Sequence, residues 1–247
     1  MSNETDSYQI DCASEKRYDS VTLRADFMFI QIDQDILERV YQDHPKTTLY
    51  ISKNPFVREI FWKRLKTLYK LMEHANHPKD HILDFGGGNG VFLPSLAQMF
   101  NHVTCIDLDT NRASKIAAVF DLKNVKLQSA NLNNESLLEK PVDAIVAADV
   151  LEHFKDLSGP VRSLTRFLKD DGFLYTSLPT ESRLYVLLRK IFNLKKPEDH
   201  YHSGYEVENF LSTNGFQRLK RRHIPFPIFS LFLVSQWKKI NSGLKRG

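Results

Sequence analysis

The sequence predicts an α/β protein in which a parallel sheet lies between two layers of helices. From residue 81 onwards, short apolar strands alternate with helical or loop segments, an order typical of a parallel sheet covered on both faces. The first of these strands runs into "FGGGNG" (85–90), which holds four of the ten glycines of the chain. A strand, a glycine turn and a helix start in this order aim backbone N–H groups at a bound ligand.

Length and composition set the broad class. A chain of 247 residues holds one large domain, or one domain with an appendage. Its hydrophobic share of 42% and charged share of 26% are those of a soluble globular protein. No apolar run reaches the roughly 20 residues that span a bilayer, the N-terminus lacks the pattern of a secretory signal, and two cysteines form no disulfide framework. We therefore expect a cytoplasmic protein.

The N-terminal part predicts two helices. Residues 1–53 are expected to form a partly disordered arm with one helix near "DQDILERVYQD" (33–43). Asn54-Pro55 is typical of a helix start. Apolar residues at spacings of three and four continue this helix through 56–75, with lysines and arginines on the other face.

The sequence from residue 81 to residue 239 predicts the strands of the sheet. Five apolar runs are read as strands: "HILDF" (81–85), "HVTCIDL" (102–108), "VKLQSA" (125–130), "VDAIVAA" (142–148) and "GFLYTSL" (172–178). After Pro179 the regular alternation stops. The expected elements there are an amphipathic helix at 181–192, a loop at 195–204, a helix at 205–215 and two strands at 216–224 and 228–239.

The glycine turn excludes two common ligand-binding motifs. No Lys-Ser or Lys-Thr follows the glycines, as a phosphate-binding loop requires. A dinucleotide pattern that starts at Gly86 needs a small residue where Val91 stands. What remains is a strand-end acid, Asp84, followed by GxGxG. This pattern resembles the first motif of the Rossmann-like (class I) S-adenosylmethionine-dependent methyltransferases.

Later segments carry the same resemblance in order: "VTCIDLD" (103–109), "VKLQSANL" (125–132), "VDAIVAADVLEHFKD" (142–156) and "FLKDDGFLYTSLPT" (167–180). It covers roughly residues 55 to 240. It implies a doubly wound seven-stranded sheet, mostly parallel with an antiparallel last strand, and an N-terminal helical arm that closes over the cofactor. The domain would span 54–240, with an insertion at 181–205 that covers the acceptor site and a basic tail at 241–247.

The resemblance also implies a set of S-adenosylmethionine-binding residues. The carboxylate of Asp107 would accept hydrogen bonds from both ribose hydroxyls, although an ordinary strand-end carboxylate is the alternative. Asn131 stands where the family usually has an Asp that faces the adenine amino group. Asp84 would orient the glycine loop near the cofactor's ammonium group. The full set is Asp84, Gly86, Gly87, Gly88, Gly90, Asp107, Leu108, Asn131, Leu132 and Asp149.

The acceptor is predicted to be a small molecule methylated at oxygen. No [Asp/Asn]-Pro-Pro-[Tyr/Phe] sequence and no Pro-Cys loop is present, which argues against known routes to adenine, glutamine and cytosine. A hydroxyl acceptor needs a base, and His153 after the fourth strand is the candidate. The alternative is that His153 packs or caps the turn. His200 and His202 lie in the insertion expected to cover the acceptor.

A divalent metal is a second hypothesis for the same residues. Asp149, Glu152 and His153 have i, i+3, i+4 spacing, and His200 or His202 could add a fourth ligand. The set is similar to the metal centre of small-RNA 2′-O-methyltransferases and of some ubiquinone-pathway O-methyltransferases. Such a metal would lower the pKa of a bound hydroxyl. Position 149 is nevertheless Asp, where those sites use Glu.

Two other functions stay open. Basic clusters at 189–196, 218–223 and 237–247 favour an RNA 2′-O-methyltransferase, but solvated strand and helix ends are the preferred explanation for them and a nucleic-acid partner is not expected. A methyltransferase-like binding subunit without activity is the other. The amphipathic stretch 181–196 would form a lid over the acceptor, or contact a membrane surface peripherally. The latter fits a lipid-like acceptor of the ubiquinone type.

Overall fold

Seven strands form one sheet at the centre of the protein. The computed structural model describes residues 28–42, 49–133, 137–181 and 200–240. The strands are β1 (His81–Phe85), β2 (His102–Asp107), β3 (Val125–Ser129), β4 (Val142–Ala148), β5 (Leu168–Pro179), β6 (Phe216–Phe226) and β7 (Phe229–Lys239). Their order in the sheet is β3-β2-β1-β4-β5-β7-β6. Only β7 runs against its neighbours, on both of its sides, so the predicted mostly parallel sheet is confirmed.

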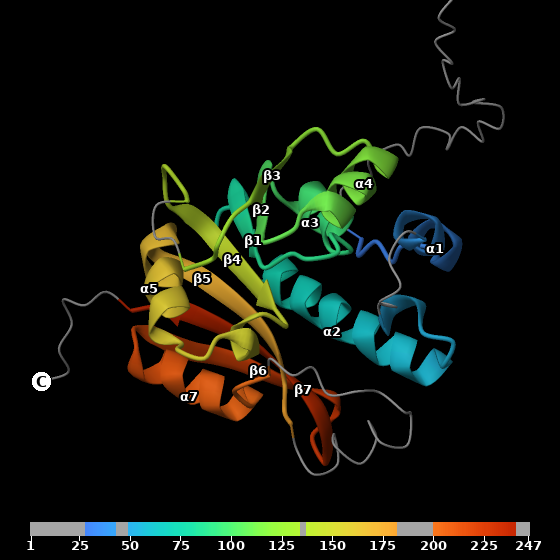
Figure 1. Cartoon of the computed structure of the whole chain (residues 1–247). Coiled ribbons are helices and arrows are strands. Elements are labelled where there is room, and N and C mark those ends of the chain that lie inside the picture. Colours follow the sequence, from blue (N-terminus) through green and yellow to red (C-terminus); the bar gives the residue numbers. More distant parts are fainter. Residues whose placement is uncertain (1–27, 43–48, 134–136, 182–199, 241–247) are drawn as a thin grey trace, which may run out of the picture.

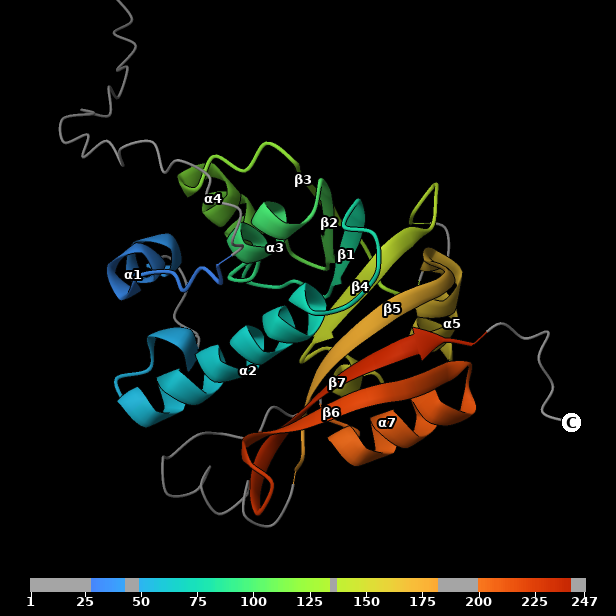
Figure 2. The same ribbon diagram turned by 180° about the vertical axis from the view of Figure 1, so that it is seen from behind.

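Helices cover both faces of the sheet (Figures 1 and 2). The helices are α1 (Gln34–Tyr41), η1 (Leu49–Ile51), α2 (Pro55–Glu73), α3 (Leu93–Met99), α4 (Asn111–Val119), η2 (Leu151–His153), α5 (Ser158–Phe167) and α7 (Gly204–Thr213). Neighbouring residues on a strand point to opposite faces. Ile82 accordingly joins the core under α1 to α4, and Leu83 joins the core under α5 and α7. Both side chains are fully buried, as in a sheet covered on both faces.

Local signals explain where the helices begin. The Asn54 side chain accepts hydrogen bonds from the backbone N–H of Phe56 at 3.0 Å and of Val57 at 3.4 Å, and Pro55 takes the first helical position. The predicted arm helix is present as α1. Tyr41 at its end donates a hydrogen bond to the carbonyl oxygen of Asn89 at 3.1 Å. The arm is therefore anchored on the glycine turn.

Some predicted segments lie outside the described residues. They are 1–27 and 43–48 of the arm, most of the amphipathic stretch at 182–199, and the tail at 241–247. The division of the chain into arm, domain, insertion and tail stays a prediction.

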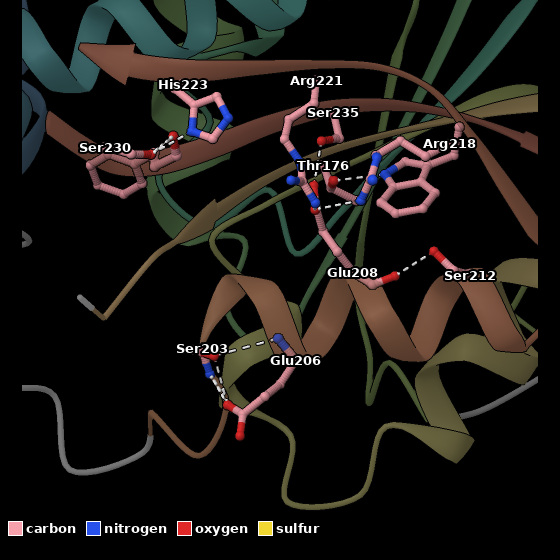
Figure 3. Close-up of polar contacts among 12 residues, drawn as sticks. Thr176, Ser203, Glu206, Glu208, Ser212, Arg218, Arg221, His223, Ser230 and Ser235 are labelled. Carbon is pink, nitrogen blue, oxygen red and sulfur yellow. Dashed lines mark hydrogen bonds and ion pairs between the residues drawn. The ribbon is translucent and has the colours of Figure 1, made fainter. Parts of the chain in front are cut away.

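The antiparallel end of the sheet is attached to α7 through a buried carboxylate. Figure 3 shows Glu208 of α7 between the side chains of Arg218 and Arg221, which both come from β6. Arg218 donates to Glu208 at 3.0 Å, and Ser235 of β7 donates to its other carboxylate oxygen. Glu208 is 1% exposed, so the charge is paired where water cannot solvate it. This network fixes the β6–β7 hairpin against the helix layer.

Candidate active site

The glycine turn lies where the order of strands reverses. The chain leaves β1 at this turn, and β1 pairs with β2 on one side and β4 on the other. Ligands of doubly wound sheets bind in this crevice, beyond the carboxyl ends of the strands. A cavity of about 240 Å³ is found here. It is lined by the turn, by Asp84 and Asp149 at the strand ends, and by Tyr50, Phe61 and Arg64 among others.

Two glycines of the turn have different roles. Gly86 has a φ of +77°, and a Cβ atom there would lie 2.3 Å from the Val150 side chain, so this position is closed by packing. Gly88 has a φ of +49°, but its Cβ would face open space, with the Asp107 carboxylate nearest at 3.8 Å. The backbone at Gly88 is therefore free to receive a ligand in close approach.

Asp107 stands at the rim of the turn. One of its carboxylate oxygens accepts a hydrogen bond from Gly88 N–H at 2.8 Å, and the other accepts one from Asp109 N–H at 3.2 Å. These bonds fix the orientation of the carboxylate and leave lone pairs for further donors. With its orientation fixed in this way, the carboxylate has the capacity to accept hydrogen bonds from two hydroxyl groups.

Asp84 is buried beneath the turn. Its side chain is 3% exposed, and a Cβ atom on Gly87 would lie 2.7 Å from its carboxylate. Burial, followed by the negative charge of Asp107, raises the pKa of Asp84 to about 7. A cation bound in the cavity would relieve this penalty.

The predicted cofactor residues are only partly brought together. Asp84, Gly86, Gly87, Gly88 and Asp149 line the cavity. The other predicted residues do not line it: Gly90, Asp107, Leu108, Asn131 and Leu132. Leu108 is exposed beside the turn and Leu132 is packed in the core, so any contact of Leu132 with a ligand would come from its backbone.

Arg64 is a site residue that the sequence analysis missed. It is 3% exposed, forms an ion pair with Asp149, and donates a hydrogen bond to the Tyr50 hydroxyl at 2.7 Å. The rings of Phe61 and Phe232 lie 4.6 and 5.1 Å from the guanidinium carbon. Burial raises the pKa of the Asp149 carboxyl, and the guanidinium opposes that shift.

The spacing of apolar residues along α2 indicates that Arg64 is buried. Arg64 follows Ile60 by four residues and precedes Leu68 by four, so it lies on the apolar face of α2. A cation at such a position requires a buried anion. The sequence predicts that the lysines and arginines of α2 lie on its outer face. For Arg64 this prediction is wrong.

Two histidines meet beyond β4. The rings of His153 and His200 are 4.7 Å apart between centroids and nearly perpendicular, at 76°. His200 Nδ1 lies 2.9 Å from a carboxylate oxygen of Glu181, and the two side chains are 8% and 13% exposed. Both histidines are near enough to Asp149 for their positive charge to lower its pKa. His202 instead lies 3.2 Å from the Lys155 carbonyl oxygen, outside this cluster.

Glu152 is buried next to the histidines. Its side chain is fully buried, and neither carboxylate oxygen has a hydrogen-bond partner among the described residues. Burial, followed by the charge of Asp149, raises its pKa well above the ordinary value. Burial of Glu152 thus favours its protonated form over the carboxylate.

The predicted four-ligand metal set is assembled only in part. Ligand atoms of Glu152, His153 and His200 lie within 4.8 Å of one another. Asp149, the fourth predicted ligand, is bound instead to Arg64, so its carboxylate does not join this group. The described residues therefore do not fit the four-ligand centre inferred from the sequence.

The glycine turn, the cavity and the strand order agree with comparisons to known proteins. A model of a methyltransferase domain family matches residues 56–235. The chain is 27% identical over 157 residues to a polyketide synthase-nonribosomal peptide synthetase of Aspergillus clavatus, a match that covers 60% of this chain and 4% of that protein. It is 29% identical over 118 residues to a ubiquinone biosynthesis O-methyltransferase of Albidiferax ferrireducens, covering 43% and 45% of the two chains. The chain thus matches less than half of the length of either relative.

Solved structures show the same fold. An N-methyltransferase from Bradyrhizobium japonicum, solved with S-adenosyl-L-homocysteine, has a TM-score of 0.62 at 15% identity, covering 83% of this chain and 99% of that one. Magnesium protoporphyrin IX methyltransferase from Synechocystis has a TM-score of 0.60 at 20% identity, covering 83% and 93%. Within the described ranges, no helix is long and apolar enough to cross a membrane. Because the family model extends over most of the chain and the strand order agrees, the chain belongs to the methyltransferase domain family and has the Rossmann-like fold of class I methyltransferases.

Proposed function

We propose that this enzyme transfers a methyl group from S-adenosylmethionine to a hydroxyl oxygen of a small molecule. The observation that carries the proposal is the pairing of His200 with Glu181, beside the cavity that would hold the donor. A carboxylate-oriented imidazole is the group needed to remove a hydroxyl proton. The likeness to a ubiquinone biosynthesis O-methyltransferase supports an oxygen acceptor, and a lipid-like phenol is one such acceptor.

The cavity and the residues beside it support binding of the methyl donor. The open space at Gly88 admits a ligand against the backbone, and the fixed carboxylate of Asp107 would accept from the ribose hydroxyls. Asp84 would face the ammonium group of the methionine part, while Asn131 would accept from the adenine amino group. The donor, when bound, supplies a methyl group already activated on a sulfonium sulfur.

The residues of this chain would position the acceptor hydroxyl and accept its proton. In the tautomer in which His200 Nδ1–H donates to Glu181, Nε2 carries no proton and would be able to accept one. With the donor and acceptor bound, His200 Nε2 would accept the proton that the acceptor hydroxyl loses when it is methylated. The Glu181 carboxylate then stabilises the imidazolium. His153, the base predicted from the sequence, lies against His200 and is the alternative base in the same cluster.

A transfer assay with a radiolabelled methyl donor tests the function. The full chain would be offered phenolic small molecules, including quinols with lipid tails, and in parallel total RNA. We expect label in the small molecules, no loss of rate with chelator, and slower transfer by Asp107→Ala when the donor concentration is near the wild-type dissociation constant. Label in RNA would support the alternative RNA methyltransferase, chelator-sensitive transfer would support a metal, and binding of the donor without any transfer would support an inactive subunit.

Cofactor affinity should depend on Asp107 and on the space at Gly88. Asp107→Ala should weaken binding of S-adenosylhomocysteine roughly 10- to 100-fold, because hydrogen bonds to a charged group contribute about 1.5–3 kcal/mol. Gly88→Val should weaken binding further, because its side chain would occupy the space beside the turn and a β-branched residue is strained at the φ of +49°. Isothermal calorimetry measures both. Asp109→Ala is the matched control, since the Asp109 side chain is exposed and accepts from Asn111 N–H; an equal loss in that variant would contradict the assignment.

Donor binding should also depend on pH through Asp84. Its raised pKa of about 7 means that below pH 7 the carboxyl of the free enzyme is neutral, and a bound ammonium must displace its proton. The dissociation constant should therefore fall as pH rises from about 6 to 8, by up to roughly tenfold per pH unit below the pKa. Calorimetry across this range, in buffers of different ionisation enthalpy, also counts the released proton.

Stability without donor should show the opposite slope. The folded-state pKa of Asp84 exceeds the unfolded value, so the folded state binds the proton more tightly. The contribution of Asp84 to stability is full below the unfolded pKa of about 4 and is lost as pH rises to about 7. Asp84→Asn should remove both slopes. An Asn variant that keeps the wild-type pH dependence of binding would show that another group is responsible.

A further inference from the structure

The β6–β7 hairpin ends in an exposed apolar turn. We call residues 226–229 the hairpin tip. Ile228 is 99% exposed and Phe226 is 59% exposed. Turns of this kind are usually occupied by Gly, Asn, Asp, Pro or Ser. Figure 2 shows the hairpin reaching past α7, so the two large apolar side chains lie at a projecting end of the described structure.

The whole hairpin is basic. Residues 216–239 include six lysines and arginines and no aspartate or glutamate. Two of them, Arg218 and Arg221, are bound to Glu208 (Figure 3). At the far end from the tip, Lys238 and Lys239 pair with two aspartates, Asp171 at 3.0 Å and Asp170 at 3.1 Å.

The remaining two cations of the hairpin lie in the middle of β6. Lys220 and Arg222 are exposed, and neither forms an ion pair with an acidic side chain within the described part of the chain. Lys63 of α2 adds a third positive charge, because its ammonium nitrogen lies 5.2 Å from the centre of the Phe226 ring. Lys63 thus borders the apolar tip, and Lys220 and Arg222 extend the positive charge along β6; no ion pair of these three with an acidic side chain is found within the described ranges.

Protection of a sheet edge explains only part of this pattern. β6 is an edge strand, and exposed lysine and arginine on an edge oppose pairing with another chain. That role covers Lys220 and Arg222 but requires no apolar turn. Binding of RNA would use the same cations together with rings that stack on bases, whereas the most exposed side chain of the tip is the aliphatic Ile228. Apolar side chains surrounded by cations are the composition that enters the surface of an anionic bilayer.

We propose that the hairpin tip docks on the surface of an anionic phospholipid bilayer. Phe226 and Ile228 enter the boundary between head groups and acyl chains, while Lys63, Lys220 and Arg222 contact lipid phosphates. The tip is tied to the active site through β5: Thr180 N–H donates to the Leu231 carbonyl oxygen at 2.9 Å. Docking would therefore bring the Glu181 side of the enzyme toward the bilayer.

Vesicle co-sedimentation tests this docking without donor or acceptor, so the result does not depend on the methyl-transfer proposal. The full chain should bind phosphatidylcholine vesicles that contain phosphatidylglycerol, and binding should weaken with salt. The double variant Phe226→Ser/Ile228→Ser should lower the partition coefficient roughly tenfold or more, since it removes most of the inserted apolar area. Val119→Ser, an exposed apolar position on α4, is the matched control and should bind like wild type.

Charge is tested separately. Lys220→Glu/Arg222→Glu should abolish binding to the anionic vesicles, whereas Lys126→Glu on β3, the opposite edge of the sheet, should not. All these variants should keep wild-type turnover of a water-soluble acceptor. The proposal is overturned if wild type ignores anionic vesicles, if the tip variants bind as wild type does, or if the cations prove to bind RNA instead. It is also overturned if the tip variants lose only self-association in sedimentation velocity, which would make the tip a contact between copies.

Discussion

Replacing His200 by alanine should lower kcat by roughly 10²- to 10⁴-fold, which is the usual contribution of a positioned general base. The Glu181 carboxylate fixes the imidazole at 2.9 Å and leaves its second nitrogen for the acceptor proton. Affinity for the donor should stay close to wild type, because His200 does not line the donor cavity. Steady-state kinetics with saturating donor, together with calorimetry, separate these two quantities.

The pH profile distinguishes a base from a packing residue. The wild-type rate should rise with pH as the imidazole loses its proton, and this rising limb should vanish in His200→Ala. Glu181→Gln should keep the hydrogen bond but lose the charge that stabilises the imidazolium, so its kcat should also fall. A structural role for His200 would lower the melting temperature while the rate per folded molecule stayed the same.

Neighbouring histidines provide the controls. His202→Ala should leave kcat unchanged, because His202 is near the His200 cluster in sequence but lies against the Lys155 carbonyl. His153→Ala tests the alternative base. If that variant loses the rising limb while His200→Ala retains it, the base is His153 and the assignment of His200 is wrong.

Replacing Arg64 by methionine should cost about 3–5 kcal/mol of unfolding free energy, the range observed when one partner of a buried ion pair is removed. Methionine retains most of the volume but leaves the Asp149 carboxylate without its cation and the Tyr50 hydroxyl without its donor. Asp149 keeps 22% of its side-chain surface exposed, so we expect the lower end of this range. Urea denaturation followed by circular dichroism measures the change.

A double variant identifies the source of that loss. Arg64→Met/Asp149→Asn should recover part of the stability, because an amide carries no charge and tolerates the positive φ of 54° at position 149. Lys66→Met, on the exposed side of the same helix, should change stability by no more than about 0.5 kcal/mol. Equal losses in Arg64→Met and Lys66→Met would contradict the buried pair.

The sheet was predictable because its signals are local. Short apolar runs, the glycine turn and the Asn54-Pro55 start each depend on a few neighbouring residues, and all three appear in the structure. β5 begins four residues earlier than expected, at Leu168 instead of Gly172. The predicted run began only after "LKDD", where two aspartates conceal the start of the strand.

The active-site pairs were less predictable because they join distant parts of the chain. Glu181 and His200 stand at either end of the segment 182–199, and nothing in the sequence relates the carboxylate to the imidazole. Arg64 and Asp149 are 85 positions apart, counted from their residue numbers. The period of α2 indicates that Arg64 is buried, but only the fold identifies the anion that accompanies it.

Identifying the atom that receives the methyl group tests the proposed hydroxyl methylation most directly. The full chain would be incubated with a donor carrying a ¹³C-labelled methyl group and with the acceptor pool that the transfer assay identifies, and the product would be examined by carbon NMR. We predict a methoxy resonance, with transfer that is weakened in Asp107→Ala at limiting donor and falls sharply in His200→Ala at saturating donor. A methyl resonance on nitrogen or carbon, or transfer that persists at the wild-type rate in His200→Ala, would contradict methylation of a hydroxyl by a Glu181-oriented base.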